Sequence, residues 1–302
     1  MRSSNISAVL ALTAIAASGV YAQDKSPSVK LVKGPASIKL DGNEGVLNLP
    51  KGYIFIDKAT SERLLKKNGE PVGDHLMGMV SEDKDDLQWM GILEYEPSGY
   101  IKDDEADHLD ADGLLTSIKE GTEEANEERK KNGASPMDVI GWFNPPQYDR
   151  KSHFLAWSIV GKDAEQKEPM VNFNALELGR YGYISCTVVG DKADAPLLQS
   201  KLGVLESSVK FVKGHDYASF REGDAVSKVT MAGLITGGAA AAAYGAAKVG
   251  LLGKIGILLL GLKKGLIVIL AAMAAGFRKL KERMTAKKNQ PPAAGAPPAD
   301  TV

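Results

Sequence analysis

The polar and aromatic side chains that could form a binding site are densest between Trp142 and Arg180. The candidates are Trp142, Tyr148, Asp149, His153, Trp157, Asn172 and Arg180, with Arg150 and Asn174 beside them. The guanidinium of Arg180 could hold a carboxylate or a phosphate through two parallel hydrogen bonds, and the two tryptophans could form an aromatic wall. A second interpretation is a hydrophobic core that contains a buried ion pair between Arg180 and Asp149. The sequence leaves both open.

Catalytic and metal-binding patterns are weak. The histidines, His75, His108, His153 and His215, lack the HxxxH and HExxH spacings of metal sites. Ser207 and Lys210 fit the SxxK spacing of penicillin-binding enzymes, but neither an SxN nor a KTG partner follows. We therefore expect no catalytic residue, no metal and no cofactor, while a hydrolase with an unrecognised site stays an alternative.

Strands and helices must position the candidate residues. The predicted strands cover residues 36–41, 45–49, 53–56, 75–81, 87–95, 137–143, 153–160, 170–178, 181–189 and 210–213, rich in β-branched and aromatic residues. The predicted helices cover residues 58–68, 112–131 and 195–208, with Asp57, Asp112 and Asp194 as N-caps. Because strands and helices do not alternate regularly, we predict an α+β domain with a mainly antiparallel sheet and helices packed on one side.

Both ends of the chain are hydrophobic. Residues 1–22 have a positive start, an apolar run and a Val20-Tyr21-Ala22 cleavage pattern, which predicts a secretory signal peptide. An exported domain of residues 23–228 would follow. Export permits disulfides, but Cys186 is the only cysteine and alternates with Ile184 and Val188, so we expect it to be buried.

Residues 229–277 contain no acidic residue and predict a transmembrane or membrane-associated helical region. Val229–Ala247 is long enough to cross but weakly hydrophobic. Ile255–Phe277 is more hydrophobic but carries Lys263 and Lys264 near its middle. The first segment alone, a hairpin of both, or the longer segment could form the crossing. Residues 278–302 form a basic and then Pro/Ala-rich tail, which we expect to be disordered.

The basic tail favours a cytoplasmic C-terminus, because cytoplasmic flanks carry an excess of Lys and Arg. The expected location is the bacterial inner membrane, with the main domain periplasmic and the tail cytoplasmic. The expected partners are the lipid bilayer and either a protein partner or a homo-oligomer through the transmembrane region. The net charge of −1 gives no reason to expect nucleic acid binding.

Three stretches carry a resemblance to a known family. They are GWFNPPQYDRKSHFLAWSIVGKD, VNFNALELGRYGYISCTVVGD and KFVKGHDYASFREGDAVSKV. In this order, and followed by a lysine-interrupted hydrophobic end, they resemble DUF2167, a bacterial family of predicted membrane-anchored proteins without an established activity. Residues 181–213 also look like the end of PsbP/Mog1-like α+β domains. The first resemblance implies a bacterial envelope protein and assigns no catalytic residue.

Three hypotheses follow from the sequence. The first is a membrane-anchored envelope protein whose non-enzymatic domain binds a ligand or a protein partner. The alternatives are a membrane-tethered periplasmic hydrolase and an oligomerising membrane scaffold. The sequence identifies neither a ligand nor a pathway.

Overall fold

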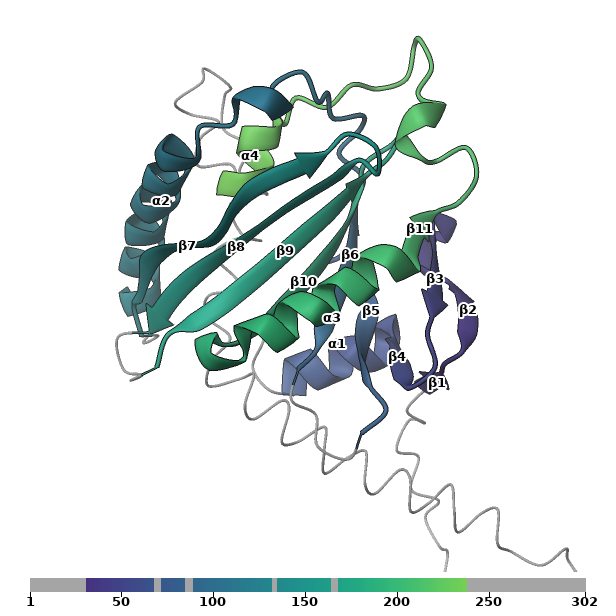
Figure 1. Cartoon of the computed structure of the whole chain (residues 1–302), viewed down its shortest axis with the longest axis horizontal. Helices are drawn as coiled ribbons and strands as arrows, with labels where there is room; N and C mark the ends of the chain where they lie inside the picture. The colour runs from purple at the N-terminus through teal and green to yellow at the C-terminus, as the bar shows by residue number, and fades with distance from the viewer. Residues whose placement is uncertain (1–30, 68–71, 85–88, 132–134, 164–167, 238–302) are drawn as a thin grey trace, which may run out of the picture.

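An antiparallel sheet of eight strands organises the part of the chain that the computed structural model describes, residues 31–67, 72–84, 89–131, 135–163 and 168–237 (Figure 1). Its strand order is β1-β4-β5-β6-β10-β9-β8-β7. The strands are β1 (Leu31–Lys33), β4 (Tyr53–Asp57), β5 (Leu76–Glu82), β6 (Gly91–Glu96), β7 (Met137–Asp149), β8 (Phe154–Asp163), β9 (Met170–Leu178) and β10 (Tyr183–Asp191). A second sheet has the order β11-β3-β2 and contains β2 (Ala36–Lys39), β3 (Gly45–Leu49) and β11 (Val209–Phe211). The α+β class and the antiparallel sheet are confirmed.

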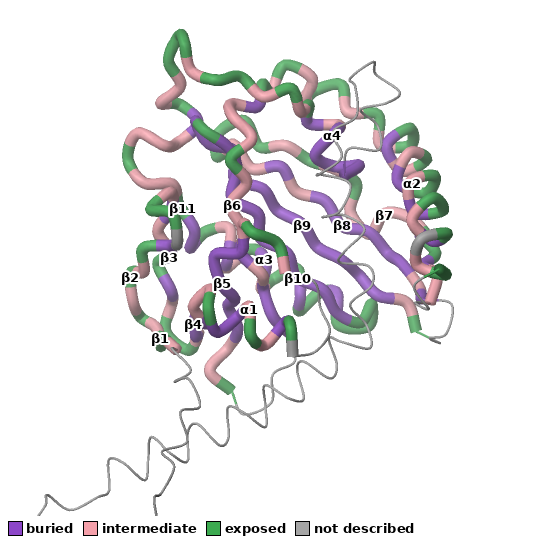
Figure 2. The backbone as a smooth tube through the Cα atoms, turned by 180° about the vertical axis from the view of Figure 1, so that it is seen from behind, coloured by how far each residue is buried: buried purple, intermediate pink, exposed green. Residues whose placement is uncertain are grey.

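Helices cover both faces of the large sheet, so the prediction of helices on one side is wrong. Helix α3 (Ala195–Ser208) packs on one face, and α1 (Lys58–Lys67), α2 (Ala111–Lys131) and α4 (Met231–Thr236) lie on the other (Figures 1 and 2). Burial explains this arrangement, because every residue of β9 is buried, and so is every residue of β10 except the last, Asp191. A strand buried on both faces needs cover on both sides.

Alternate residues of the central strands enter two different cores. Val171, Phe173 and Ala175 of β9 face α3, and belong to the core that this helix completes. Leu176 and Leu178 belong to the core on the side of α2 and α4. The two sets alternate because successive side chains of a strand point to opposite faces of the sheet.

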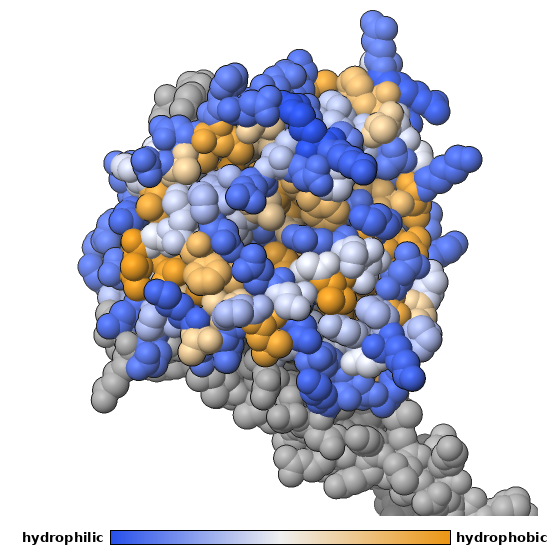
Figure 3. Space-filling view, viewed as in Figure 1, coloured by the Kyte–Doolittle hydropathy of each residue, from blue (hydrophilic) through white to orange (hydrophobic). Residues whose placement is uncertain are grey.

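Helix α3 lies very close to the sheet. A Cβ atom on Gly91 of β6 would lie 2.4 Å from Leu205 Cδ1, and one on Gly190 of β10 would lie 2.7 Å from Leu198 Cδ1. Larger residues at these two positions would push the helix away. On the same face, hydrophobic residues on the surface are scattered among hydrophilic ones (Figure 3).

The predicted helix starts are partly confirmed. The backbone N–H of Thr60 donates to Asp57 Oδ1 at 2.9 Å, so Asp57 caps α1 as expected. Helix α2 already begins at Ala111, before the predicted cap Asp112, and Asp110 rather than Asp112 accepts a backbone N–H, that of Gly113. Asp194 precedes α3 but makes no side-chain capping bond.

Helix α4 lies inside the first of the two segments predicted to be membrane-associated. Met231 and Ile235 are almost completely buried, in the core that α4 shares with α2 and the sheet. The backbone N–H of Ala232 donates to Glu105 Oε1 at 2.9 Å, and that of Gly233 donates to Thr230 Oγ1 at 3.1 Å. The folded domain therefore continues beyond Lys228 to Thr236.

No helix within the described ranges has both the length and the hydrophobicity needed to cross a bilayer. The signal peptide predicted for residues 1–22, the segment Ile255–Phe277 and the tail 278–302 all lie outside the described residues.

Candidate ligand-binding groove on the sheet

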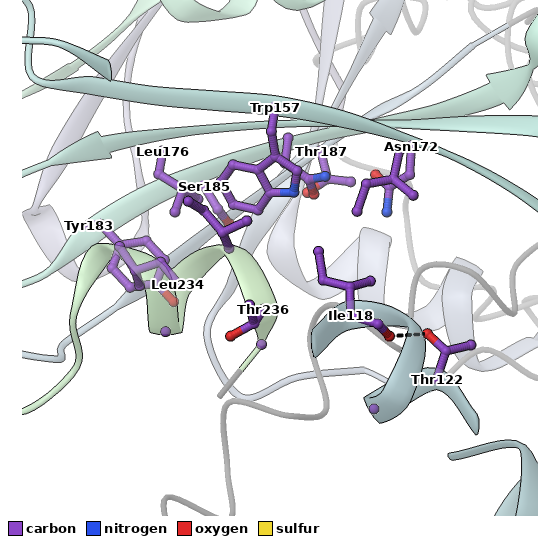
Figure 4. Close-up of a pocket in the computed structure, with 16 residues that line it drawn as sticks. Ile118, Thr122, Trp157, Asn172, Leu176, Tyr183, Ser185, Thr187, Leu234 and Thr236 are labelled. Atoms are coloured by element: carbon purple, nitrogen blue, oxygen red, sulfur yellow. Dashed lines mark hydrogen bonds between the residues drawn. The ribbon is translucent and has the colours of Figure 1, made fainter. Parts of the chain in front are cut away.

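A hollow of about 70 Å³ lies between the sheet and helices α2 and α4 (Figure 4). We call it the groove. Its lining comprises Ile118, Gly121 and Thr122 of α2, Trp157 and Ile159 of β8, Asn172, Asn174 and Leu176 of β9, Tyr183, Ser185 and Thr187 of β10, and residues 233–237. None of these side chains carries a charge. The volume is about that of two molecules of liquid water.

The floor of the groove is a set of four buried polar side chains. Asn172 and Asn174 come from β9, and Ser185 and Thr187 come from β10. Asn174 lies directly opposite both Thr187 and Trp157 in the antiparallel registers, and residues in direct opposition share a face of the sheet. The local sequences VNFNA and ISCTV therefore place the hydrophobic residues towards α3 and the polar residues towards the groove.

Asn172 is the most informative of these residues. Its side chain extends from the sheet into the space between α2 and α4 (Figure 4) and is only 5 % exposed. Its Oδ1 atom has no hydrogen-bond partner among the described residues. A buried acceptor without a donor costs about 1–3 kcal/mol. A ligand that supplies an N–H or O–H donor would remove this cost.

Two aromatic side chains frame the polar floor. Trp157 is 8 % exposed, and Tyr183 is buried at the other end of the groove near Leu234 (Figure 4). Burial is the main cause that raises the pKa of the Tyr183 hydroxyl, and the nearby carboxylates of Glu96 and Glu94 raise it further. Tyr183 is therefore neutral at physiological pH and presents a hydrogen-bonding group without a charge.

Carboxylates lie on the next strand, beside the end of the groove. Glu94 of β6 is directly opposite Ser185, and Glu96 is directly opposite Tyr183, so all four share a face. Burial is the largest cause that raises the pKa of the Glu94 carboxyl, and the nearby Glu96 raises it further. His75 Nε2 lies 3.6 Å from Glu96 Oε2. Burial also raises the pKa of Glu96, so both carboxyls favour the protonated form more than exposed carboxyls do.

The structure brings together only some of the predicted site residues. Trp157 and Asn172 line the groove, as does Asn174. Trp142 lies outside it, and its Nε1 donates to the carbonyl oxygen of Ala111 at 3.0 Å, where it holds the start of α2. Ser185 and Thr187 also line the groove and are not among the residues predicted from the sequence. Their alternation with hydrophobic residues in a buried strand was the signal that could have found them.

Tyr148, Asp149 and His153 form a structural cluster at the turn between β7 and β8. Tyr148 Oη donates to Asp103 Oδ2 at 3.1 Å and lies 3.0 Å from His153 Nδ1. Asp149 accepts the backbone N–H of Lys151 at 2.8 Å and the hydroxyl of Ser152 at 2.7 Å, which lowers the pKa of its carboxyl. These bonds shape the turn rather than a ligand site.

Arg180 is committed to Asp224, so the alternative ion pair with Asp149 is wrong. Its Nε and Nη2 atoms donate to the two carboxylate oxygens of Asp224 at 2.7 and 2.8 Å. The guanidinium carbon also lies 4.8 Å from the centre of the Tyr181 ring. A guanidinium already held by a bidentate carboxylate is a poor site for a second anion.

The candidate nucleophiles are not arranged for catalysis. Ser207 Oγ donates to the carbonyl oxygen of Val204, and Lys210 Nζ donates to that of Glu206, so the SxxK residues do not contact each other through a hydrogen bond. Cys186 is buried as expected, and burial raises the pKa of its thiol. No group of three metal-ligating side chains is found within the described ranges.

A larger hollow of about 290 Å³ lies on the opposite face, between α3 and strands β7 and β8. Its lining includes Asn144, Gln147, Gln199 and Glu206. No side-chain atom among its described lining residues is both buried and without a hydrogen-bond partner. The smaller groove, which contains the unpaired oxygen of Asn172, is therefore the stronger candidate for a binding site.

Comparisons with known proteins identify a family but no activity. No curated protein matches the chain. A solved structure, the solution structure of cyanobacterial PsbP (CyanoP) from Synechocystis sp. PCC 6803, is similar over 67 % of this chain and 99 % of that one, with 11 % sequence identity and a TM-score of 0.35. A family model, described as a protein of unknown function (DUF2167), matches residues 32–274. Because this match covers most of the chain, the protein belongs to the DUF2167 family.

Proposed function

We propose that this protein is an envelope protein of the bacterial inner membrane, whose periplasmic domain binds a ligand or a partner through the groove. The observation that carries the proposal is the buried polar floor, in which Asn172 Oδ1 has no partner among the described residues. Buried polar groups in folded proteins are normally satisfied, and exceptions call for an explanation. A bound donor is the explanation that we adopt.

The predicted signal peptide and basic tail support the location of the domain. The burial of α4 supports one of the three membrane arrangements over the others. If residues 231–236 and the C-cap Gly237 belong to the folded domain, only residues 238–247 remain of the first hydrophobic segment. That remainder is shorter than the roughly 20 residues that a crossing helix requires. The longer segment, Ile255–Phe277, is therefore the crossing in this proposal.

The groove lies where the folded domain ends and the chain continues towards the proposed membrane segment. Residues 233–237 line the groove and directly precede the chain that leads to the membrane. A ligand in the groove would contact the last part of the domain before the membrane. This position suits a domain that senses or captures a molecule close to the bilayer.

Thermal unfolding of the full-length protein in detergent tests the proposal. The protein is screened against cationic, neutral and anionic small molecules, since a ligand that binds only the folded state raises its stability. We expect at least one molecule to raise the Tm of the wild-type protein and to lose this effect in Asn172→Ala.

The matched control is Asn48→Ala, on an exposed position of the small sheet. It should keep the ligand-induced rise in Tm. A screen without any shift, or a shift that is the same in all three proteins, would contradict a binding site at the groove.

A further inference from the structure

The polar side chains of the groove form no hydrogen bonds with the described part of the domain. They are the amides of Asn172 and Asn174, the hydroxyls of Ser185 and Thr187, and the indole N–H of Trp157. All five residues are at most 9 % exposed, and among the described residues no hydrogen bond involves any of these side chains. Since buried polar groups are normally satisfied, this set calls for a bound partner.

Two of these groups have fixed and opposite roles. Oδ1 of Asn172 can only accept a hydrogen bond, and Nε1 of Trp157 can only donate one. Trp157 lies opposite Asn174, and Asn172 lies two residues along the same strand, so the two groups are diagonal neighbours on one face of the sheet. Figure 4 shows both side chains extending from the sheet towards α2 and α4. A molecule that satisfies both must donate one hydrogen bond and accept another.

A charged group meets this requirement poorly. An ammonium group can only donate, and a carboxylate can only accept. No side chain of the lining carries a charge, and burying an ion without a partner of opposite charge costs far more than burying a neutral polar group. Glu94 and Glu96, on the next strand, are not part of the lining. An uncharged group that both donates and accepts, such as a hydroxyl or a carboxamide, fits.

The walls and the volume limit what is attached to this group. Ile118 of α2, Leu176 of β9 and Leu234 of α4 lie around the polar floor (Figure 4). A water molecule gains nothing from such side chains, whereas methylene groups are stabilised by burial against them. The hollow of about 70 Å³ has room for the polar group and the first carbon atoms of a chain.

From these features we infer that the groove binds the uncharged, hydrogen-bonding end of an aliphatic molecule, an alcohol or a primary amide. The inference rests on the proposed function, because it names the ligand class of the same site. The bound group donates to Asn172 Oδ1 and accepts from Trp157 Nε1. Its carbon chain packs against Ile118 and Leu234.

The indole N–H signals of the protein can report binding at a single residue. The chain has three tryptophans, Trp89, Trp142 and Trp157. Trp89 Nε1 already donates to Glu82 Oε2 at 3.1 Å, and Trp142 Nε1 donates to the carbonyl oxygen of Ala111 at 3.0 Å. In a nitrogen–proton correlation spectrum of the full-length protein in detergent, a ligand in the groove should therefore shift the Trp157 signal and leave the other two in place. The variant Trp157→Phe identifies this signal.

Five probes of similar size test the ligand class. Butyramide and 1-butanol are uncharged and can both donate and accept. In 2-pentanone a methyl group replaces the amino group of the amide, so this probe can only accept; butyrate is an anion, and butylamine is a cation that can only donate. We expect butyramide or 1-butanol to shift the Trp157 signal in a saturable way, with a Kd about tenfold or more below those of the other three. The tighter of the two identifies the head group.

Asn172→Leu tests the acceptor. It should weaken the binding of the tighter probe by about tenfold, which corresponds to about 1.4 kcal/mol. It should also remove the advantage of this probe over 2-pentanone, because the donor of the probe then has no acceptor. Asn48→Ala, at an exposed position of the small sheet, should leave the Kd unchanged. The comparison of probes on the wild-type protein remains decisive even if Asn172→Leu fails to fold.

The possible outcomes separate the ligand class from the site. Binding of butylamine or butyrate as tight as that of the uncharged donors, seen at the Trp157 signal, would overturn the uncharged class while the groove stays a binding site. Equal affinities for butyramide, 1-butanol and 2-pentanone would overturn the need for a donor. A Trp157 signal that no probe shifts would overturn the inference and leave the groove to water. The broader thermal screen then decides the proposed function.

Discussion

Arg180 and Asp224 form a bidentate ion pair that ties the turn between β9 and β10 to the loop that leads to α4. Two hydrogen bonds of 2.7 and 2.8 Å join the guanidinium and the carboxylate, and the side chains are 10 % and 14 % exposed. Asp224 Oδ2 also accepts the backbone N–H of Arg221 at 2.7 Å. The pair connects residues that are far apart in the sequence, and it holds the loop that positions one wall of the groove.

This pair predicts coupled effects of substitution. Arg180→Ala and Asp224→Ala should each lower the Tm by several degrees, and the double variant should lose little more than either single variant. The reason is that the second substitution removes a partner that has already lost its bond. Thermal unfolding of the four proteins measures the coupling. Additive losses would show that the two side chains act independently.

The sequence predicted the strands and helices of this fold better than their assembly. Residues 195–208 were predicted as a helix and form α3, and β9 has the predicted bounds. Strand β7 extends beyond the predicted end through Pro145 and Pro146. Proline cannot donate to a neighbouring strand, but β7 is an edge strand with register shifts at this point, so the missing N–H groups are tolerated.

The site was harder to predict than the strands. The residue types of Asn172 and Trp157 predict a shared site, and both side chains line the groove. The ion-pair hypothesis pairs Arg180 with Asp149, whereas its partner in the structure is Asp224. Asp224 lies in a long loop whose path is fixed by tertiary contacts and not by periodicity. Similarly, the hydrophobic sequence of α4 fits a membrane segment or a buried helix, because both environments favour the same residues.

Trp157 should contribute strongly to stability. It is 8 % exposed and packs in the core that contains Leu155 and Ile159. Trp157→Ala should therefore lower the free energy of unfolding by about 3–5 kcal/mol, as large truncations in protein cores do. Denaturant unfolding followed by circular dichroism measures this loss. Ile140→Ala, at an exposed position of β7, is the control, and a Trp157→Ala loss below about 1 kcal/mol would contradict the burial of this side chain.

Met231 tests whether α4 belongs to the folded domain. Its side chain is fully buried in the core shared with α2, so Met231→Ala should destabilise the domain by about 2–5 kcal/mol. Val226→Ala, nearby in the chain but exposed, should change the stability by less than about 0.5 kcal/mol. Denaturant unfolding of the full-length protein in detergent compares the two. Equal and small effects would place Met231 outside the domain core.

Glu177 should make the stability of the domain depend on pH. Burial raises the pKa of its carboxyl from 4.5 to about 7, although Lys210 and a backbone hydrogen bond from Phe211 lower it. Lys210 Nζ lies 3.8 Å from Oε1, and Oε2 has no hydrogen-bond partner among the described residues. The folded state therefore favours the protonated form.

The sign of the pH effect follows from this shift. The stabilising contribution is fully present below pH 4.5 and is lost as the pH rises towards and through 7. The loss should amount to roughly 3 kcal/mol, and it should be absent in Glu177→Gln. Denaturant unfolding between pH 4 and pH 8 compares this variant with Glu127→Gln, which changes an exposed residue of α2. An identical pH profile in the wild-type protein and Glu177→Gln would contradict the prediction.

In the proposed topology, the domain lies in the periplasm and the tail after residue 277 lies in the cytoplasm. Because Cys186 is buried, it should not react with a maleimide in the folded protein, so single cysteines can be introduced as reporters. Lys151→Cys places one at an exposed position of the domain, and Asn289→Cys places one in the tail. Spheroplasts are treated with a membrane-impermeant maleimide before and after permeabilisation. We expect Lys151→Cys to react in intact spheroplasts and Asn289→Cys to react only after permeabilisation. Reaction of Asn289→Cys in intact spheroplasts, or protection of Lys151→Cys, would rule out this topology.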